Sequence, residues 1–358
     1  MFDLTPIFER PAFSLGKVEK AVVFSAALSE LTRQHYAQCP QYKKILDAMG
    51  FDVAATHAVA DIPFIPVRLF KEYELISVDK GQIFKTMTSS GTTGQRVSRI
   101  FLDKVTAANQ TRALVKITAQ FFGPKRLPML IIDSSATVKN RALFSARGAG
   151  ILGFSMLGHD VTYALDDAMR FDEAAVTAFV ERHRGEQVLV FGFTFMIWEH
   201  FYKALAESGR KLALDNGVML HGGGWKKLAQ LAVDNAAFKH GIEEVSGIRR
   251  VHNYYGMVEQ TGSIYMECEH GRLHCSSFSD IIIRRHTDFA PCALHDPGLI
   301  QLVSLLPSSY PGHSILSEDV GELTGEDDCP CGRLGRTFTV HGRVRDAEIR
   351  GCSDTYAA

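Results

Sequence analysis

The chain contains 358 residues, of which 46% are hydrophobic and 22% charged, and its formal net charge is −1. These are ordinary globular values, so disordered and fibrous classes are excluded, and the length predicts a large domain plus something smaller. Because the charge is near neutral and no basic arm is present, we expect no nucleic-acid partner. No apolar run reaches the ~18 residues of a membrane span, and residues 1–6 lack a signal-peptide pattern. We therefore expect a cytoplasmic protein without a membrane span.

Elements with helical spacing fill residues 16–50, with an interruption at Pro40, and residues 106–122 predict another helix. Three apolar, strand-like runs follow, with helical segments between them. These runs lie at 128–133, 187–192 and 218–225, and the helical segments at 173–184 and 196–208. This alternation predicts a largely parallel sheet with helices on both faces, and ligands bind such sheets at the carboxyl ends of the strands.

The pattern changes near Val251, where short strands separated by turns indicate a smaller antiparallel subdomain. These strands are expected at 279–285, 298–306 and 320–324. We predict an α/β core over residues 1–250, a β-rich subdomain over 251–340 and a short hinge or tail over 341–358.

A run of hydroxyl residues and glycines follows a strand-like segment at 82–86. It consists of Thr88, Ser89, Ser90, Gly91, Thr92, Thr93 and Gly94. Such residues cannot build a packed core, but their amides and hydroxyls can surround a phosphate. The glycine spacing is not that of a Walker loop, and no lysine follows the second glycine. From its residues alone the run is either a phosphate-binding loop or a polar turn between strands.

Three later motifs also suit a nucleotide. Tyr255 and Gly256 offer a ring and a bare backbone to a planar base, and Glu259 after them can hold Mg²⁺. Asp319 is expected in a loop ahead of a strand, where it can bind ribose hydroxyls, and Arg343 follows a glycine as a cation for phosphate. Taken alone, the first motif favours a buried tyrosine pair with a surface Glu, and the Asp319 motif is equally consistent with a solvated acidic turn.

The order of these motifs resembles the adenylate-forming superfamily of acyl-CoA synthetases, peptide-synthetase adenylation domains and luciferases. Val258 stands where that superfamily usually has Thr, and Ser317-Glu318 where it has Thr-Gly. Within it the chain is most similar to LuxE-type acyl-protein synthetases, and phenylacetate–CoA ligases are the next relatives. The segments that carry this similarity are 62–71, 191–195, 223–228 and 349–354.

The resemblance implies the large domain of an adenylate-forming enzyme, with its C-terminal lid domain lacking or vestigial, and ATP and Mg²⁺ as cofactors. It assigns Thr88 to Gly94 to the ATP phosphates, Glu259 to Mg²⁺, Asp319 to ribose and Arg343 to the ribose or α-phosphate. The adenine would be held by Gly222, Gly223, Gly224, Tyr255 and Gly256. Either Lys226, Lys227 or another core cation replaces the lysine that a lid normally supplies, or the first half-reaction runs without that contribution; the sequence leaves both open.

Seven cysteines are present, and six of them lie beyond residue 267. In a cytoplasmic protein they are expected to be reduced thiols, ligands or nucleophiles. Cys352 follows Arg350, and a nearby cation lowers a thiol pKa. The resemblance makes Cys352 the acceptor that takes the acyl group and passes it to or from a partner protein such as a reductase. The alternative is an incidental exposed cysteine.

A second group of thiols suggests a metal. A ligand set suited to tetrahedral Zn²⁺ is formed by Cys268, His274, Cys329 and Cys331. A metal bound there would link the start of the antiparallel subdomain to its end. His270 and Cys275 are rival ligands, and reduced thiols in turns are the alternative without a metal.

Three functions stay open. The favoured one is ATP-dependent activation of a carboxylic acid, expected to be fatty, as acyl-AMP with transfer to the Cys352 thiol. The second is an acyl- or aryl-CoA ligase with CoA as acceptor. The third is a non-catalytic subunit that binds nucleotide or acyl groups. The sequence does not determine the chain length of the acid or the oligomeric state.

Overall fold

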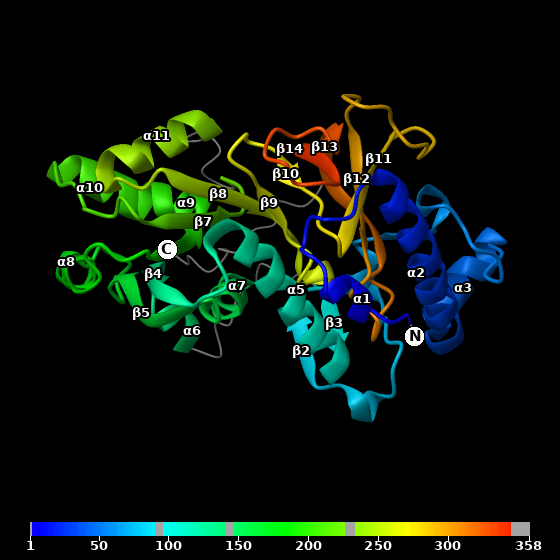
Figure 1. Cartoon of the computed structure of the whole chain (residues 1–358). Helices are drawn as coiled ribbons and strands as arrows, with labels where there is room; N and C mark the ends of the chain where they lie inside the picture. Colours follow the sequence, from blue (N-terminus) through cyan, green and yellow to red (C-terminus); the bar gives the residue numbers. More distant parts are fainter. Residues whose placement is uncertain (1, 90–95, 140–145, 226–232, 345–358) are drawn as a thin grey trace. The chain divides into compact units, whose positions relative to one another are not determined.

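The computed structural model describes residues 2–89, 96–139, 146–225 and 233–344 (Figure 1). Contacts between residues divide the chain into two compact units. Of the described residues, unit 1 contains 2–89, 96–121 and 256–344, and unit 2 contains 122–139, 146–225 and 233–255. The described residues of unit 2 therefore all lie between residues 122 and 255, and they interrupt those of unit 1. No helix in the described part of the chain is long and apolar enough to cross a membrane.

Unit 2 is built on a parallel sheet with the strand order β8-β7-β6-β4-β5. Its strands are β4 (Leu127–Ser134), β5 (Gly158–Leu165), β6 (Leu189–Phe193), β7 (Val218–Gly222) and β8 (Arg250–Tyr255). Every residue of β4, β6 and β7 is buried. This explains why these three strands read as continuous apolar runs in the sequence.

Helices cover both faces of this sheet, as expected for a parallel arrangement. They are α6 (Ala136–Lys139), α7 (Ala146–Ser155), α8 (Glu173–Arg182), α9 (Thr194–Met196), the π-helical turn Ile197–Tyr202, α10 (Lys203–Ser208) and α11 (Asn235–Ser246). One core cluster joins strand residues such as Val190 and Met219 to α8, α10 and α11 through Phe179, Leu205 and Phe238. On the other face α7 places Phe154 against Phe191, with ring centroids 4.6 Å apart. The predicted α/β class is confirmed.

Unit 1 holds an antiparallel sheet, β11-β12-β13-β14-β10-β9, and a separate hairpin, β2-β3. Its strands are β1 (Ile65–Pro66), β2 (Lys85–Thr88), β3 (Arg99–Leu102), β9 (Tyr265–Glu267), β10 (Leu273–His274), β11 (Ser279–Arg284), β12 (Gly298–Ser304), β13 (Ser314–Glu326) and β14 (Arg336–Arg343). Its helices are α1 (Thr5–Phe8), α2 (Lys17–Gln38), α3 (Pro40–Met49), α4 (Leu69–Glu72) and α5 (Lys104–Phe122), with a 3-10 turn at Val258–Gln260. β1 pairs in parallel with β13.

The boundaries differ in detail from those expected. β8 pairs in parallel with β7, so antiparallel pairing starts after Tyr255 rather than at Val251. Residues 2–89 belong by their contacts to the same unit as residues 256–344, which no local pattern in the sequence could indicate. The division of the chain at residues 250 and 340 stays a prediction.

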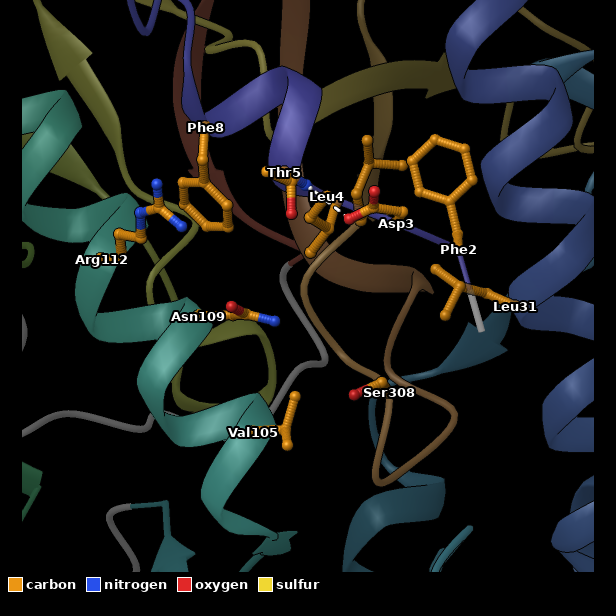
Figure 2. A pocket seen from close by; sticks show the side chains of 11 residues that line it. Phe2, Asp3, Leu4, Thr5, Phe8, Leu31, Val105, Asn109, Arg112 and Ser308 are labelled. Carbon is orange, nitrogen blue, oxygen red and sulfur yellow. Dashed lines mark hydrogen bonds between the residues drawn. The ribbon is translucent and has the colours of Figure 1, made fainter.

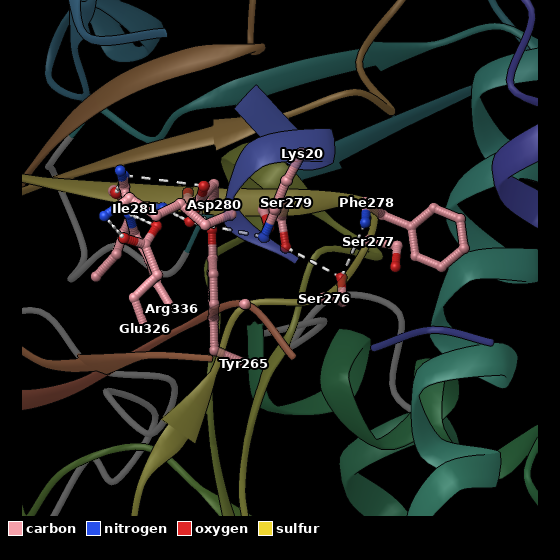
Figure 3. A network of polar contacts seen from close by, with 12 residues as sticks. Lys20, Tyr265, Ser276, Ser277, Phe278, Ser279, Asp280, Ile281, Glu326 and Arg336 are labelled. Carbon is pink, nitrogen blue, oxygen red and sulfur yellow. Dashed lines mark hydrogen bonds and ion pairs between the residues drawn. The ribbon is translucent and has the colours of Figure 1, made fainter. Parts of the chain in front are cut away.

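A buried ion-pair network fastens α2 to the antiparallel sheet, as Figure 3 shows. The Lys20 ammonium donates to the backbone carbonyl of Ser279 at 2.9 Å and lies 3.7 Å from an Asp280 carboxylate oxygen. Arg336 of β14 approaches the same carboxylate at 3.9 Å and pairs with Glu326 at 3.0 Å. Buried charges persist only when paired and hydrogen-bonded, so this network fixes one register between α2, β11 and β14.

Residues 307–313 connect β12 to β13, and every one of them is buried; we call this segment the buried loop. A loop inside a protein must find partners for its backbone polar groups. Here the carbonyls of Pro307 and Ser308 accept from His35 and Gln34 of α2. The buried loop is thereby tied to a helix more than 270 positions earlier in the sequence.

Two neutral histidines stack against this loop. The rings of His35 and His313 lie 4.9 Å apart at 28°. His35 donates through Nε2 to Pro307, which leaves Nδ1 to accept from Ser77. Burial lowers the pKa of His35 to about 3 and lowers the pKa of His313 well below its ordinary value. Both rings are therefore uncharged in the folded protein.

We predict that unit 1 loses stability as the pH falls below about 6.5. The unfolded chain binds protons at these histidines from pH ~6.5 downward, whereas folded His35 binds one only near pH 3. The contribution of the two neutral histidines to the free energy of unfolding is thus complete above pH 6.5 and decreases between pH 6.5 and 3. For His35 alone the loss is ~1.4 kcal/mol per pH unit, or ~2 kcal/mol at pH 5.

Urea denaturation followed by circular dichroism at pH 7.5, 6 and 5 measures this effect. The control variant is His35→Gln, which keeps an amide donor for the Pro307 carbonyl but does not titrate. Its stability should fall by about 2 kcal/mol less than that of the unsubstituted chain between pH 7.5 and 5. Equal losses in the two proteins would contradict the prediction.

Candidate functional site

The predicted nucleotide-binding residues fall in both units, and each part is described within its own unit. Thr88, Ser89, Gly256, Glu259, Asp319 and Arg343 belong to unit 1. Gly222, Gly223, Gly224 and Tyr255 belong to unit 2. Ser90, Gly91, Thr92, Thr93, Gly94 and Cys352 lie outside the described residues, as do Lys226 and Lys227.

The β2-β3 hairpin carries the first residues of the hydroxyl-rich run, Thr88 and Ser89. Thr88 ends β2 and pairs across the hairpin with Arg99. Beyond it, the Ser89 amide donates to the Ser98 carbonyl at 3.1 Å, and the Ser89 hydroxyl accepts from the Ser98 amide at 2.9 Å. The Ser89 side chain therefore helps to hold Ser89 beside Ser98.

Glu259 lies on the 3-10 turn that follows β8 in the chain, and the residue is buried, with only 4% of its surface exposed. The next residue but one, Thr261, donates to the Val258 carbonyl at 2.9 Å, and its hydroxyl lies 3.7 Å from the sulfur of Met87, which directly precedes Thr88. Met87 and Met257 both pack on one core cluster of unit 1. The proposed Mg²⁺ ligand and the start of the proposed phosphate loop are thus carried by neighbouring elements.

Asp319 and Arg343 form a cross-strand pair between β13 and β14. The Arg343 Nε lies 3.4 Å from an Asp319 carboxylate oxygen. We expected Asp319 in a loop ahead of a strand, and this is wrong: it lies inside β13, which runs from Ser314 to Glu326. A shift of register between Val320 and Gly321 interrupts the regular pairing next to it. The two residues assigned to ribose and phosphate are therefore adjacent.

In unit 2 the remaining nucleotide residues lie at the carboxyl ends of parallel strands. Strand register sets Gly222 of β7 between Phe193 of β6 and Tyr254 of β8. Gly222 has room for no side chain, because a Cβ there would lie 2.4 Å from the Tyr254 ring. Gly223 follows with a φ of +78° and turns the chain away. This edge is where open α/β sheets bind ligands.

A hydroxyl–imidazole pair that the sequence analysis did not single out fixes the end of β7. Thr194 donates to the Gly222 carbonyl at 3.2 Å and lies 2.9 Å from Nδ1 of His221. Because the Thr194 proton is committed to Gly222, His221 donates through Nδ1. Burial lowers the pKa of His221 to about 3, so its ring is neutral.

A buried ion pair stands at the end of β4 in the same unit, and it too was missed. The Arg147 Nε lies 3.1 Å from an Asp133 carboxylate oxygen, and both residues are at most 5% exposed. Thr137 donates to the other oxygen at 2.7 Å. The only available sequence signal was an acid directly after an apolar strand.

The four predicted zinc ligands come together in unit 1. Their ligand atoms, from Cys268, His274, Cys329 and Cys331, all lie within 4.8 Å of one another. The sulfurs of Cys268 and Cys329 are 3.8 Å apart, and the sulfur of Cys331 is 3.4 Å from Nε2 of His274. Around a tetrahedral zinc, sulfur–sulfur and sulfur–nitrogen pairs lie about 3.8 Å and 3.6 Å apart.

The backbone around the cluster also suits thiolate ligands. Two turns of the same form carry the cysteines: Gly271 donates its amide to the Cys268 carbonyl, and Gly332 does so to the Cys329 carbonyl. Both glycines have positive φ, +74° and +77°. The amide of His270 donates to the Cys268 sulfur at 3.4 Å, so His270 supports the cluster rather than joining it.

The protonation states of two of the four residues fit ligands, whereas burial raises the pKa of Cys329 to about 12. Burial lowers the pKa of His274 to about 4, which leaves a neutral imidazole. Burial opposes ionisation of Cys331, yet hydrogen bonds from Arg333 lower the pKa of its thiol. The rival Cys275 lies outside this group of four, and burial raises its pKa well above the ordinary value.

A pocket of about 300 Å³ lies elsewhere in unit 1, between the N-terminal segment, α2, α5 and the buried loop. Figure 2 shows Asn109 and Val105 of α5 facing Leu4 and Ser308 across it. None of the residues assigned to nucleotide or metal lines this pocket.

Comparison with known proteins identifies the family. The family model described as "Acyl-protein synthetase, LuxE" matches residues 3–358. The chain belongs to this family. As a member, it is an ATP-dependent, AMP-forming ligase that activates an acyl group. A search of curated proteins gives no match.

Solved structures share the fold. An open conformation of 2-hydroxyisobutyryl-CoA ligase, in complex with 2-HIB-AMP and CoA, has a TM-score of 0.72 at 16% identity and covers 94% of this chain and 78% of its own. The same ligase in the thioesterification state has a TM-score of 0.70 at 16% identity, covering 94% and 71%. A long-chain-fatty-acid–CoA ligase from Archaeoglobus fulgidus has a TM-score of 0.50 at 13% identity, covering 73% and 52%. These likenesses place the chain in the adenylate-forming fold.

We predict that Gly222→Ala destabilises unit 2 by about 1–3 kcal/mol, because the new methyl group forces the Tyr254 ring from its place. Trp198 and Trp225 both lie in unit 2, so thermal unfolding followed by tryptophan fluorescence reports this unit.

The matched control for this substitution is Gly153→Ala on α7. A Cβ at position 153 meets nothing within 4 Å, and alanine is the better helix former. The control should melt at or above the temperature of the unsubstituted chain. A Gly222→Ala variant with the same melting temperature as the Gly153→Ala control would disprove the close packing at β7.

Proposed function

We propose that this protein activates a fatty acid as an acyl-adenylate and transfers the acyl group to its own Cys352, for delivery to or from a partner protein such as an acyl reductase. The observation that carries this proposal is the match of the acyl-protein synthetase family over residues 3–358, which includes Cys352. The six described cysteines are free, which supports a cytoplasmic location with reduced thiols.

In the first step, the carboxylate oxygen of the acid attacks the α-phosphorus of ATP. An oxygen–phosphorus bond forms, the bond to the β-phosphate bridge breaks, and pyrophosphate leaves. Charge develops on the phosphate oxygens, so donors and cations fixed around them lower the barrier. We assign Thr88 to Gly94 to the triphosphate and Arg343, held by Asp319, to the ribose and α-phosphate.

Mg²⁺ would be held by Glu259, whose buried carboxylate offers the hard oxygen ligand that this ion prefers. When bound, the ion neutralises phosphate charge. The edge formed by Gly222, Gly223 and Gly224 would receive the adenine together with Tyr255 and Gly256, since the small residues leave the backbone open to a planar base.

In the second step, the Cys352 thiolate attacks the acyl carbon. A carbon–sulfur bond forms, the bond from the acyl carbon to the AMP oxygen breaks, and AMP leaves. A thioester on the chain itself results, and it can pass to a second nucleophile without further ATP.

We predict that Cys352→Ser keeps acid-dependent ATP–pyrophosphate exchange within about twofold but loses covalent labelling by a radioactive fatty acid, because adenylation does not use the thiol. Labelling is measured on denatured protein with and without hydroxylamine, over acids of increasing chain length. Cys292→Ser, which alters a free cysteine in unit 1, should keep both activities.

Hydroxylamine-sensitive labelling that persists undiminished in Cys352→Ser would refute the role of this thiol. A CoA acceptor is the second candidate, favoured by the likeness of the fold to 2-hydroxyisobutyryl-CoA ligase with CoA bound. Formation of acyl-CoA by the Cys352→Ser variant would establish that alternative. Exchange that is absent with every acid would instead favour a non-catalytic binding subunit.

We further propose that Cys268, His274, Cys329 and Cys331 hold a structural Zn²⁺. The distances between their ligand atoms, the two glycine turns and the neutral His274 support this assignment. All four positions would be filled by protein ligands, as in structural rather than catalytic zinc sites.

The zinc assignment predicts about one zinc per chain in protein purified without a histidine tag, measured by plasma mass spectrometry. Cys329→Ser should lower the zinc content to well below one half and reduce the melting temperature, because the metal would contribute folding free energy. Cys292→Ser is the control and should keep its zinc. A zinc content near zero in the unsubstituted chain would end the proposal.

A further inference from the structure

We propose that the buried loop, residues 307–313, positions the catalytic elements of unit 1, and that Tyr310 is its main positioning residue. This inference rests on the proposed roles of Glu259 and of the phosphate loop. The loop contacts the turn that carries Glu259, the hairpin that carries Thr88 and Ser89, and the start of α5.

Tyr310 holds the main chain of Glu259 itself. Its hydroxyl donates to the Glu259 carbonyl at 2.9 Å and accepts from the Gln110 side chain of α5 at 3.3 Å. The tyrosine is fully buried, and burial raises its pKa, so the hydroxyl keeps the proton that it donates. A carbonyl inside the protein that loses its donor carries a large free-energy penalty, which makes this contact hard to replace.

Gln260, the residue after Glu259, donates hydrogen bonds from the turn to the buried loop and to β12. The side-chain amide of Gln260 donates to the carbonyl of Gly312 at 2.9 Å and to that of Leu302 at 3.1 Å. Gly312 closes against Tyr310, because a Cβ at position 312 would lie 2.2 Å from the Tyr310 ring and 3.0 Å from the Glu259 carbonyl. The turn and the loop therefore hold each other through two hydrogen bonds and one close backbone approach.

Ser309 ties the same loop to the phosphate-loop hairpin. Its hydroxyl donates to the Phe101 carbonyl of β3 at 2.8 Å, and its amide donates to the Thr106 hydroxyl at 3.1 Å. β3 is the partner of β2, at whose end Thr88 begins the hydroxyl-rich run. One short segment thus fixes the backbone of both elements that are assigned to the Mg²⁺–triphosphate group.

Such a support matters because a metal ligand must be held to within about 0.5 Å by the residues behind it. The Tyr310 hydroxyl bonds to the Glu259 backbone and to the Gln110 side chain, and neither residue is assigned to the acid or to adenine. Removing the Tyr310 hydroxyl should therefore raise the Mg²⁺ concentration that the enzyme needs, while the reaction rate at saturating Mg²⁺ should change little.

The test compares Tyr310→Phe with Tyr265→Phe. Tyr265 is equally buried in unit 1 and donates to a backbone carbonyl, that of Asp280, at 3.1 Å. Both substitutions remove one hydroxyl from one such bond. Two measurements follow: the Mg²⁺ concentration for half-maximal ATP–pyrophosphate exchange, and hydrogen exchange of amides 256–262.

For Tyr310→Phe we expect the half-maximal Mg²⁺ concentration to rise about five- to tenfold, with the rate at saturating Mg²⁺ within about twofold. Exchange of amides 256–262 should accelerate by a similar factor. Tyr265→Phe should change neither. Should Tyr310→Phe fail to fold, Gln110→Met removes only the bond that orients Tyr310, and it should shift both measurements in the same direction by less.

Equal effects of Tyr310→Phe and Tyr265→Phe, or an unchanged Mg²⁺ requirement in Tyr310→Phe, would overturn the positioning role. Absence of pyrophosphate exchange in the unsubstituted chain would count against the proposed function instead. The hydrogen-exchange comparison would then still decide the anchoring, and unchanged protection at 256–262 would refute it.

Discussion

Unit 1 depends on a single constraint, which is that a loop placed in the interior must have all its backbone polar groups hydrogen-bonded. Backbone groups of residues 307–313 meet much of this constraint with partners from α2, α5 and the turn at Val258–Gln260. The side chains of Ser309 and Tyr310 in turn donate to β3 and to the same turn. Because each bond has a specific partner, the helices and the hairpin of unit 1 can take only one arrangement around the loop. The Glu259 turn shares this anchor through the bonds of Tyr310 and Gln260.

The sequence was most informative where local pattern and burial coincide. β4, β6 and β7 were predicted correctly because both faces of each strand are covered, so nearly every residue is apolar. β5 was missed, because it is buried only at its two ends and is exposed or half-buried in between, so it shows neither a continuous apolar run nor a clean alternation. The four residues of the Cys/His cluster could be picked out because thiols in short turns are a chemical pattern that does not depend on the fold.

The buried loop was invisible to sequence reasoning for a physical reason. Its Ser, Pro and Gly residues are those of an exposed turn, and only contacts with residues such as Gln34 and Gln110 bury it. Asp319 was misplaced for a similar reason, since the neighbouring half-exposed polar residues hide a strand that continues through them. The pairing of Asp319 with Arg343 also needs the register of two strands, which no spacing in the sequence provides.

The interruption of unit 1 by unit 2 has a consequence for synthesis on the ribosome. The described residues of unit 2 lie between 122 and 255 in the chain, and they can begin to fold as soon as they emerge, because domains generally fold as units in order of synthesis. Helices α2 and α5 are made earlier, yet their polar partners in residues 307–313 appear only near the end of translation. At 5–20 residues per second, the ~200 residues between α5 and that segment take roughly 10–40 seconds to make. During that interval the first-made third of the protein is the part most exposed to aggregation and to chaperone binding.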